Sequence, residues 1–202
     1  NFDPILFLAS HEYNNIMSLP KHVWQQLTHF LANMNMVWYD SLTGIYNRSF
    51  MTHMAEIESE RATRYKRPLS IALIDIDNFK KINDEYGHST GDGVLVEVAR
   101  RIKAAARNTD MCGRYAGDEF LILLPETPVS KTHFLGARIL KGVNETPFEI
   151  NGKIIDMTIS IGVATIDADK KSSVLEIINK ADKMLYEAKG KGKNTYRVYE
   201  ET

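Results

Sequence analysis

The chain has 202 residues, 44% of them hydrophobic, so it can bury the core of one domain together with a modest appendage. Its 25 basic and 26 acidic residues give a net charge of -1, which excludes a global field that would recruit nucleic acid or an anionic membrane. Any anion site must therefore be local. A single cysteine, Cys112, excludes an internal disulfide and a cysteine-cluster metal site, and it fits a reducing cytoplasm.

The first 39 residues are expected to form a helical segment that precedes a globular domain over 40–202. Ser18 is a suitable N-cap and Pro20 fits the first helical turn. Apolar residues then recur at alternating three- and four-residue steps over about two heptads, as in a coiled-coil seam. This pattern fits either a helix packed on its own domain or a dimerising, signal-transmitting helix. The seam residues are Trp24, Leu27, Leu31, Met34 and Trp38.

The sequence contains no apolar run that approaches the length of a bilayer span. Its start has neither a basic leader nor a small-residue cleavage site. We therefore expect a cytoplasmic chain that makes no membrane contact of its own. Because the first residue is not methionine, we also expect a piece of a longer protein, whose other regions could attach it to a membrane.

The first half of the globular domain is expected to alternate helices with buried strands. The spacing predicts a helix over 48–65, and Pro68 then breaks the chain before the β-branched apolar run of 69–77, which is typical of a buried strand. A further helix is predicted to begin at Asp92. Two strands follow, joined by a tight turn at 116–119 that contains a glycine.

The second half continues with hairpins and helices. Pro125 and Pro128 are expected to end the preceding strand and open a helix, and an Asn-Gly pair at 151–152 marks another hairpin, whose second arm is expected to run on as one strand. An amphipathic helix that runs into a Lys/Gly loop over 172–194 and a strand over 195–199 complete the chain. This order predicts an α+β fold around a mixed, mainly antiparallel sheet rather than a doubly wound parallel sheet.

Carboxylates gather at the ends of two predicted strands. Asp75 and Asp77 lie where one strand ends, and Asp118 and Glu119 lie at the tip of a hairpin. If the strands are neighbours, these acids converge and need a cation, because burying several carboxylates together costs several kcal/mol each. Mg²⁺ prefers one or two carboxylates plus substrate phosphates, so the pattern favours a metal and triphosphate site. Alternatively, the aspartates only cap a helix or make a turn.

Two other motifs are excluded by particular residues. A calcium loop that begins at Asp75 would need an acid or amide at its fifth position and glycine at its sixth, where Phe79 and Lys80 stand. The string AKGKGKN over 188–194 is rich in lysine and glycine, but the chain lacks the glycine-spaced loop ending in Gly-Lys-Ser/Thr of a P-loop.

Five segments occur in a distinctive order: DSLTGIYNR (40–48), DIDNFKKINDEYGHSTGD (75–92), RYAGDEF (114–120), SIGVA (160–164) and ADKMLYEAKGKGKN (181–194). Together they resemble the signature blocks of the GGDEF-domain family, the diguanylate cyclases, over roughly 40–198. The resemblance implies a fold like the polymerase palm. It also implies a homodimer in which two domains face each other, each carrying one GTP, and condense them to cyclic di-GMP with release of two pyrophosphates.

The resemblance also assigns the metal site. It implies that Asp75, Asp118 and the carbonyl of Ile76 bind metal, with Glu119 as a further ligand or as the general base for the 3'-hydroxyl. Two ions, Mg²⁺ or Mn²⁺, are implied for each half-site. In such two-metal phosphoryl transfer one cation lowers the pKa of the attacking hydroxyl, and both offset charge on the α-phosphate and leaving group.

Substrate contacts follow from the same resemblance. Asn83 and Asp92 match the positions that hydrogen-bond the guanine edge, and an adenine would leave Asp92 unpaired, so ATP should be rejected. Lys193 stands where the family more often has arginine, so a point charge replaces a bidentate contact. By themselves, the lysines fit a solvated surface equally well. The implied phosphate-binding residues are Asn78, Phe79, Lys80, Lys189 and Lys193.

An Arg-x-x-Asp segment, Arg107 to Asp110, matches the family's product-inhibition site, in which arginine forks the guanine and phosphate of cyclic di-GMP. Arg138 is a weaker candidate for a secondary contact. The alternative for Arg107 is a cation placed favourably at a helix C-terminus.

Ala116 departs from the family pattern, which has glycine there. Its methyl group costs little at a negative φ, but about 1 kcal/mol or more if the position needs φ > 0 or a close approach to nucleotide. Because every acid and base-reading residue is retained, we expect an active cyclase. The alternatives are a silent domain that acts as a receptor for cyclic di-GMP or GTP, and a purely structural dimerisation module.

Overall fold

The computed structural model describes residues 38–166 and 173–200. The chain divides into two units, Asn1–Trp38 and Tyr39–Thr202. Apart from Trp38, the predicted N-terminal helix and its seam lie outside the described residues. The account below therefore concerns the second unit.

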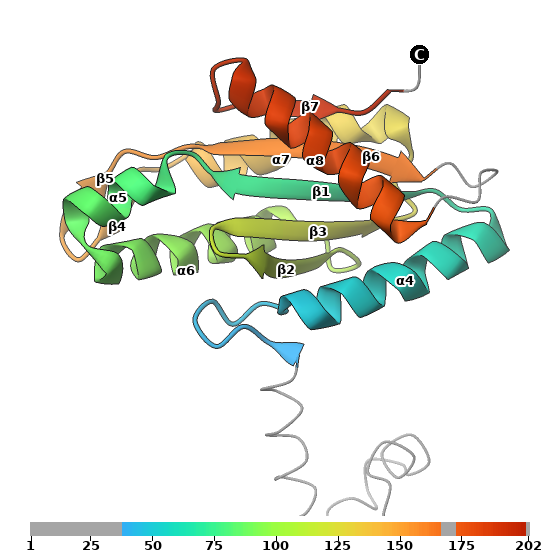
Figure 1. Cartoon of the computed structure of the whole chain (residues 1–202), viewed down its shortest axis with the longest axis horizontal. Helices are drawn as coiled ribbons and strands as arrows, with labels where there is room; N and C mark the ends of the chain where they lie inside the picture. The colour runs from blue at the N-terminus through green and yellow to red at the C-terminus, as the bar shows by residue number, and fades with distance from the viewer. Residues whose placement is uncertain (1–37, 167–172, 201–202) are drawn as a thin grey trace, which may run out of the picture. The chain divides into compact units, whose positions relative to one another are not determined.

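The centre of this unit is a sheet with the strand order β2-β3-β1-β6-β7 (Figure 1). Strand β1 pairs antiparallel with β3 and β6, and β2 pairs antiparallel with β3. Only β7 adds a parallel pair, with β6, so the prediction of a mixed, mainly antiparallel sheet is confirmed for the described residues. The strands of this sheet are β1 (Leu69–Ile76), β2 (Met111–Ala116), β3 (Glu119–Pro125), β6 (Ile159–Ile166) and β7 (Tyr196–Val198).

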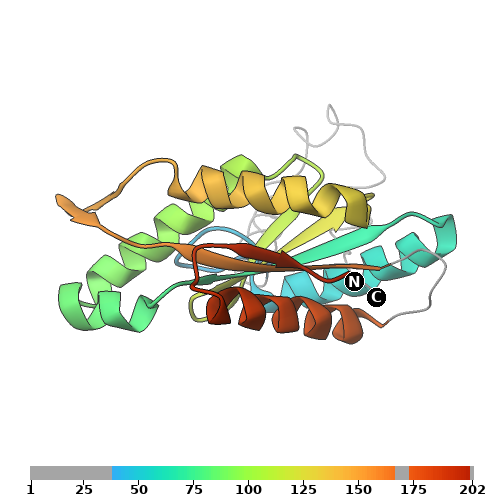
Figure 2. The same ribbon diagram turned by 90° about the horizontal axis from the view of Figure 1, so that it is seen from above.

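Helices cover both faces of the sheet, as Figure 2 shows from above. Helices α4 and α8 pack on one face, and α6 and α7, with the short α5, pack on the other. Every residue of β1 is buried, which explains why the strand is mostly apolar and does not alternate with polar residues. No helix in the described part is long and apolar enough to cross a membrane. The helices are α4 (Arg48–Tyr65), α5 (Phe79–Tyr86), α6 (His88–Ala105), α7 (Val129–Asn144) and α8 (Val174–Gly190).

Two details of the predicted elements are wrong. The helix expected from Asp92 begins at His88, because Gly87, with φ 86°, ends α5 and starts α6. The strand expected over 153–166 is broken, since β4 (Phe148–Ile150) and β5 (Lys153–Ile155) form a separate hairpin before the chain enters β6. The hairpin itself, the helix over 48–65 and the turn at 116–119 are confirmed.

Candidate active site

The predicted carboxylates meet at one end of the sheet. Strands β1 and β3 are neighbours, and Asp75 lies directly opposite Glu119 in their register. Asp118 precedes Glu119 in the turn, and its carbonyl oxygen accepts a hydrogen bond from the amide of Ile76 at 3.4 Å. The expectation that acids from two strands converge is therefore confirmed.

Burial and mutual repulsion make this cluster electrostatically costly. Burial raises the pKa of Asp75, and the Asp118 and Asp77 carboxylates add to it, while Lys189, whose Nζ lies 2.7 Å from Asp75 Oδ2, lowers it. The pKa of Glu119 is also raised, by burial first and then by Asp75. The effect of burial on the pKa of Asp75 is larger than the opposite effect of Lys189. A further cation would therefore stabilise the ionised cluster.

The donor set fits a magnesium ion that substrate helps to bind. Among the described residues no group of three or more His, Cys, Asp or Glu side chains is arranged to hold a metal ion alone. Mg²⁺ commonly takes one or two carboxylates and completes its shell with phosphate oxygens and water. Asp75, Asp118 and Glu119 supply hard oxygen donors of this kind beside Lys189, so the residues fit a metal–triphosphate complex.

The turn between β2 and β3 accommodates the alanine of the signature. Gly117 has φ 42° and needs a left-handed conformation, whereas Ala116 is not among the residues with positive φ. Arg114 holds the turn by donating from Nε to the Gly117 carbonyl at 2.8 Å, and it also pairs with Asp40 at 3.4 Å. The backbone conformation therefore gives no reason for a penalty at Ala116.

Helices α5 and α6 place Asn83 and Asp92, the two residues expected to bind the guanine base, close together. An added Cβ at Gly91 would lie 1.9 Å from Asn83 Oδ1, so the Asn83 amide rests directly against the residue that precedes Asp92. The same added Cβ at Gly91 would lie 3.3 Å from Phe79 Cζ, so the Phe79 ring also lies beside Gly91. Asp92 is exposed and Asn83 is half-buried, so both remain accessible to a ligand.

The start of α5 and the loop after α8 form the predicted phosphate-binding region. Asn78 has φ 59° and its side chain makes no capping hydrogen bond, so the first N–H groups of α5 lack helical partners. Asn78 Oδ1 instead accepts a hydrogen bond from Lys193 Nζ. Lys189 reaches Asp75, whereas Lys80 is exposed on α5.

The model of the family described as diguanylate cyclase, GGDEF domain, matches residues 37–195. The chain belongs to the GGDEF-domain family. It is 46% identical over 144 residues to diguanylate cyclase A of Treponema denticola, covering 71% of this chain and 38% of that protein. It is 39% identical over 157 residues to the response regulator PleD of Caulobacter vibrioides, covering 77% of this chain and 34% of PleD.

A solved structure shares the fold of this GGDEF domain. The coiled coil and GGDEF domain of DgcB from Caulobacter crescentus, in complex with c-di-GMP, superposes with a TM-score of 0.82 and 26% identity, covering 88% of this chain and 94% of that one. The chain spans between a third and two fifths of the length of the two curated relatives. The palm-like α+β architecture expected from the sequence is thus confirmed.

The Arg-x-x-Asp segment of the GGDEF domain forms a compact turn after α6. The Arg107 amide donates to Asp110 Oδ2 at 2.7 Å, and Arg138 Nη2 from α7 lies 3.8 Å from the same oxygen. Three buried polar atoms in this group lack hydrogen-bond partners within the described part: Asp110 Oδ1, Arg138 Nε and Arg138 Nη2. Arg107 itself is exposed, beyond the end of α6. The structure therefore brings Asp110 and Arg138 together with unused hydrogen-bonding capacity and joins Arg107 to them through its backbone amide.

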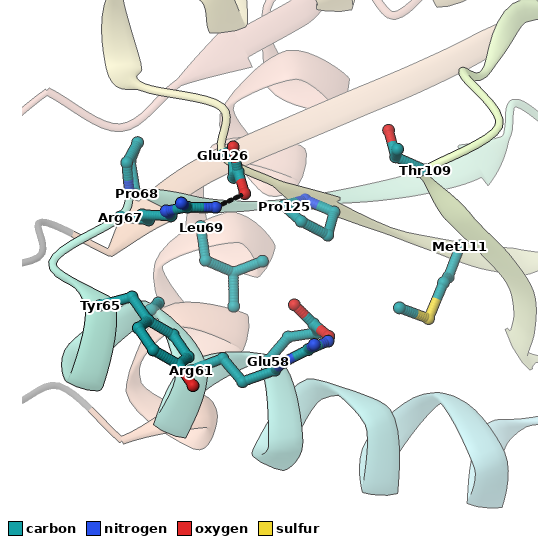
Figure 3. Close-up of a pocket in the computed structure, with 11 residues that line it drawn as sticks. Glu58, Arg61, Tyr65, Arg67, Pro68, Leu69, Thr109, Met111, Pro125 and Glu126 are labelled. Carbon is teal, nitrogen blue, oxygen red and sulfur yellow. Dashed lines mark hydrogen bonds and ion pairs between the residues drawn. The ribbon is translucent and has the colours of Figure 1, made fainter.

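A cavity of about 410 Å³ lies at the opposite end of β1 and β3 from the carboxylates (Figure 3). The two arginines that line it are each paired with a glutamate, Arg61 with Glu58 and Arg67 with Glu126. Because both cations are neutralised, the cavity offers no cluster of unpaired positive charge for a triphosphate. It is separate from the candidate active site.

One buried acid has a different role from the one its position in the sequence predicts. The sequence places Asp77 with Asp75 at the end of one strand, but the Asp77 carboxylate accepts hydrogen bonds from Thr158 Oγ1, Ser160 Oγ and the Asn194 amide. Strand β1 ends at Ile76, so the alternation of the strand does not determine where the next side chain points. No signal in the sequence identifies these three donors.

Proposed function

We propose that this chain is a diguanylate cyclase that condenses two GTP molecules into cyclic di-GMP and releases two pyrophosphates. The observation that carries the proposal is the register of β1 and β3, which sets Asp75 opposite Glu119 with Asp118 in the adjoining turn. Family membership and the names of the relatives support the same chemistry. We propose that it acts in the cytoplasm, without membrane contact of its own.

The acids have separate roles in this proposal. Asp75, Asp118 and the Ile76 carbonyl would hold two Mg²⁺ ions, with Mn²⁺ as a substitute. When bound, the ions supply positive charge to the attacking hydroxyl and the leaving pyrophosphate. Glu119 takes the proton of the 3'-hydroxyl of one GTP as that oxygen bonds to the α-phosphate of the other. Its raised pKa suits a general base.

The groups around the acids bind and select the nucleotide. Asn83 and Asp92 bind the guanine edge, because an amide and a carboxylate match its acceptor O6 and its donors N1 and N2. An adenine would present the wrong donors and leave a polar group unpaired, so ATP is rejected. Phosphates are bound by the free N–H groups at the start of α5, at Asn78 and Phe79, and by the lysines Lys80, Lys189 and Lys193.

Cyclic di-GMP is also proposed as an inhibitor that binds at Arg107, Asp110 and Arg138. The unpartnered buried atoms of Asp110 and Arg138 support a ligand at this point. The DgcB structure, which contains c-di-GMP, is consistent with a product site in this family. Because one domain supplies only one GTP and one set of acids, the active form is a homodimer.

The test is incubation of the chain with GTP and Mg²⁺ at several protein concentrations, with cyclic di-GMP followed by chromatography. We expect product that rises more steeply than linearly with protein concentration and that disappears in Asp118→Ala. ATP in place of GTP is the specificity control.

Absence of product at every concentration would contradict the proposal. If cyclic di-GMP still bound such a silent chain, and bound it through Arg107, the chain would be a receptor.

A further inference from the structure

Asp77 holds together three segments that meet at one end of the sheet. The residue is only 4% exposed. Oδ1 accepts from Ser160 Oγ at 2.7 Å, and Oδ2 accepts from Thr158 Oγ1 at 2.6 Å and from the Asn194 amide at 3.0 Å. The Asp77 amide also donates to the Thr158 carbonyl at 2.9 Å. The residue therefore ties the end of β1 to the start of β6 and to the loop that follows α8.

That loop has an unfavourable backbone that needs support from outside. Lys193 and Asn194 are consecutive non-glycine residues at positive φ, 63° and 47°. Such conformations persist when surrounding contacts determine them. Asn194 is held by Asp77 at its amide and by Asn144 at its side chain, and the Lys193 amide donates to the Ala188 carbonyl. The hydrogen bond that the Asn194 amide donates to Asp77 ties the loop to the residue that follows strand β1.

The same loop presents Lys193 to the start of α5. Lys193 Nζ donates to Asn78 Oδ1, directly beside the uncapped N–H groups of the helix. Figure 1 shows the loop after α8 at the same end of the sheet as the end of β1 and the start of α5. A lysine and a helix N-terminus so placed bind an anion jointly only while the loop stays docked.

We propose that Asp77 is a positioning residue: by holding the Asn194 amide it fixes the Lys193 loop against α5, so that the two together bind the triphosphate. This inference rests on the proposed function, because it takes GTP as the ligand. Asp77 contacts neither metal nor substrate in this role. It acts through the position of Lys193.

A carboxylate suits this role, but its charge is not essential. The three donors are neutral, and an ionised acid satisfies all of them with two oxygens. An asparagine can keep its oxygen toward Thr158 and Asn194 while its NH₂ donates to Ser160 Oγ, because a hydroxyl also accepts. An alanine keeps none of these contacts. Asp77→Asn should therefore rescue what Asp77→Ala loses.

The first readout needs no nucleotide. In Asp77→Ala we expect hydrogen exchange at the Asn194 amide to be at least about tenfold faster than in the parent, because the hydrogen bond that protects it is gone. Glu60→Ala, the same truncation at an exposed carboxylate on α4, is the matched control and should leave this amide unchanged.

The second readout is the affinity for GTP with Mg²⁺, measured by calorimetric titration with a GTP analogue whose α- and β-phosphates are joined by a methylene group, so that no pyrophosphate is released during the titration. We expect the dissociation constant of Asp77→Ala to rise on the order of tenfold, as for loss of one charged contact, and that of Asp77→Asn to stay within about threefold of the parent. The double variant Asp77→Ala/Lys193→Ala should bind GTP no more weakly than the single variant Lys193→Ala. In the double variant Asp77→Ala/Asp92→Asn the losses of GTP-binding free energy should add, because Asp92 binds the base and does not act through Lys193.

Different outcomes contradict different statements. A parent chain that does not bind GTP would overturn the proposed function and this inference with it. If the parent binds GTP and Asp77→Ala binds it equally well, this inference alone is overturned. If Asp77→Asn is as weak as Asp77→Ala, the charge of Asp77 acts directly and the positioning role is wrong. Should Asp77→Ala not fold, Thr158→Val removes one donor and is expected to weaken GTP binding about threefold; an unchanged affinity there would overturn the inference.

Discussion

At the scale of single residues, the acids of the candidate active site oppose folding until a cation neutralises them. The pKa of Glu119 is raised in the folded domain by burial and by Asp75. A carboxyl whose pKa rises on folding stabilises the fold fully below its ordinary pKa, and this contribution is lost as the pH rises through the folded value. The metal-free domain should therefore lose stability from this group between mildly acidic and neutral pH.

The substitution Glu119→Gln tests whether the ionised Glu119 carboxylate lowers the stability of the metal-free domain. We expect it to raise the melting temperature of the metal-free domain at about pH 7 and to change it little at about pH 4, where the glutamate is largely protonated in both states. Mg²⁺ with GTP should stabilise the parent more than the variant. Thermal unfolding followed by circular dichroism across this pH range measures both effects.

Glu149→Gln, at an exposed position on β4, is the control and should show no such pH dependence. A lower melting temperature for Glu119→Gln at neutral pH would mean that the ionised carboxylate is already well compensated. In that event the electrostatic argument for a bound cation would be wrong.

Sequence reasoning at this scale succeeds where strand ends determine positions. Asp75 and Glu119 could be placed together because each borders a long apolar run, and antiparallel neighbours bring such ends into register. Asp77 could not be placed, because its partners Thr158 and Asn194 are remote in the sequence. The ion pair of Asp110 with Arg138 likewise depends on how α7 packs beside the turn after α6.

At the scale of elements, helix α8 packs directly onto the backbone of strand β6. A Cβ at Gly162 would lie 2.1 Å from the Ala181 carbonyl oxygen and 2.3 Å from the Leu185 amide nitrogen. These are backbone atoms, so a side chain cannot swing aside and the helix must shift. The same helix carries Lys189 to Asp75, and the contact therefore couples sheet packing to the site.

Gly162→Ala is expected to destabilise the domain by about 2 kcal/mol or more, since overpacking against a fixed backbone displaces the whole helix. Urea denaturation monitored by circular dichroism gives the free energy of unfolding. Gly190→Ala is the matched control, because nothing lies within 4 Å of its added Cβ, and it should change stability by no more than about 0.5 kcal/mol. Equal stability of parent and Gly162→Ala would show that α8 is not held against β6 in this way.

The elements that the sequence did not predict are short or interrupted. Helix α5 has eight residues and begins at Phe79. The side chain of Asn78, which precedes it, accepts a hydrogen bond from Lys193 instead of capping the helix, so the usual cap interaction is absent. The helix predicted to begin at Asp92 begins at His88, so Asp92 lies inside α6. The break between β5 and β6 occurs at 156–158 without glycine or proline, where the Thr158 carbonyl and hydroxyl both bind Asp77.

At the scale of the whole molecule, the proposed reaction needs two domains, because cyclic di-GMP contains two phosphodiester bonds. Each bond forms between the 3'-hydroxyl of one GTP and the α-phosphate of the other. A dimer with one disabled set of acids forms at most one of these bonds, and its product is a linear dinucleotide. Cyclic product therefore reports dimers in which both halves are intact.

Mixing the parent with Asp118→Ala at fixed total protein tests this requirement. If the two chains pair at random, intact dimers scale with the square of the parent fraction, so replacing half of the parent should leave about one quarter of the cyclic product formed per unit time. A chain that acts alone would instead leave about half. Sedimentation must first show that the variant dimerises like the parent, and chromatography should detect the linear dinucleotide as mixed dimers form. If the rate of cyclic product formation instead varied linearly with the parent fraction and no linear dinucleotide appeared, one domain would complete both bonds. The paired half-sites would then not be required.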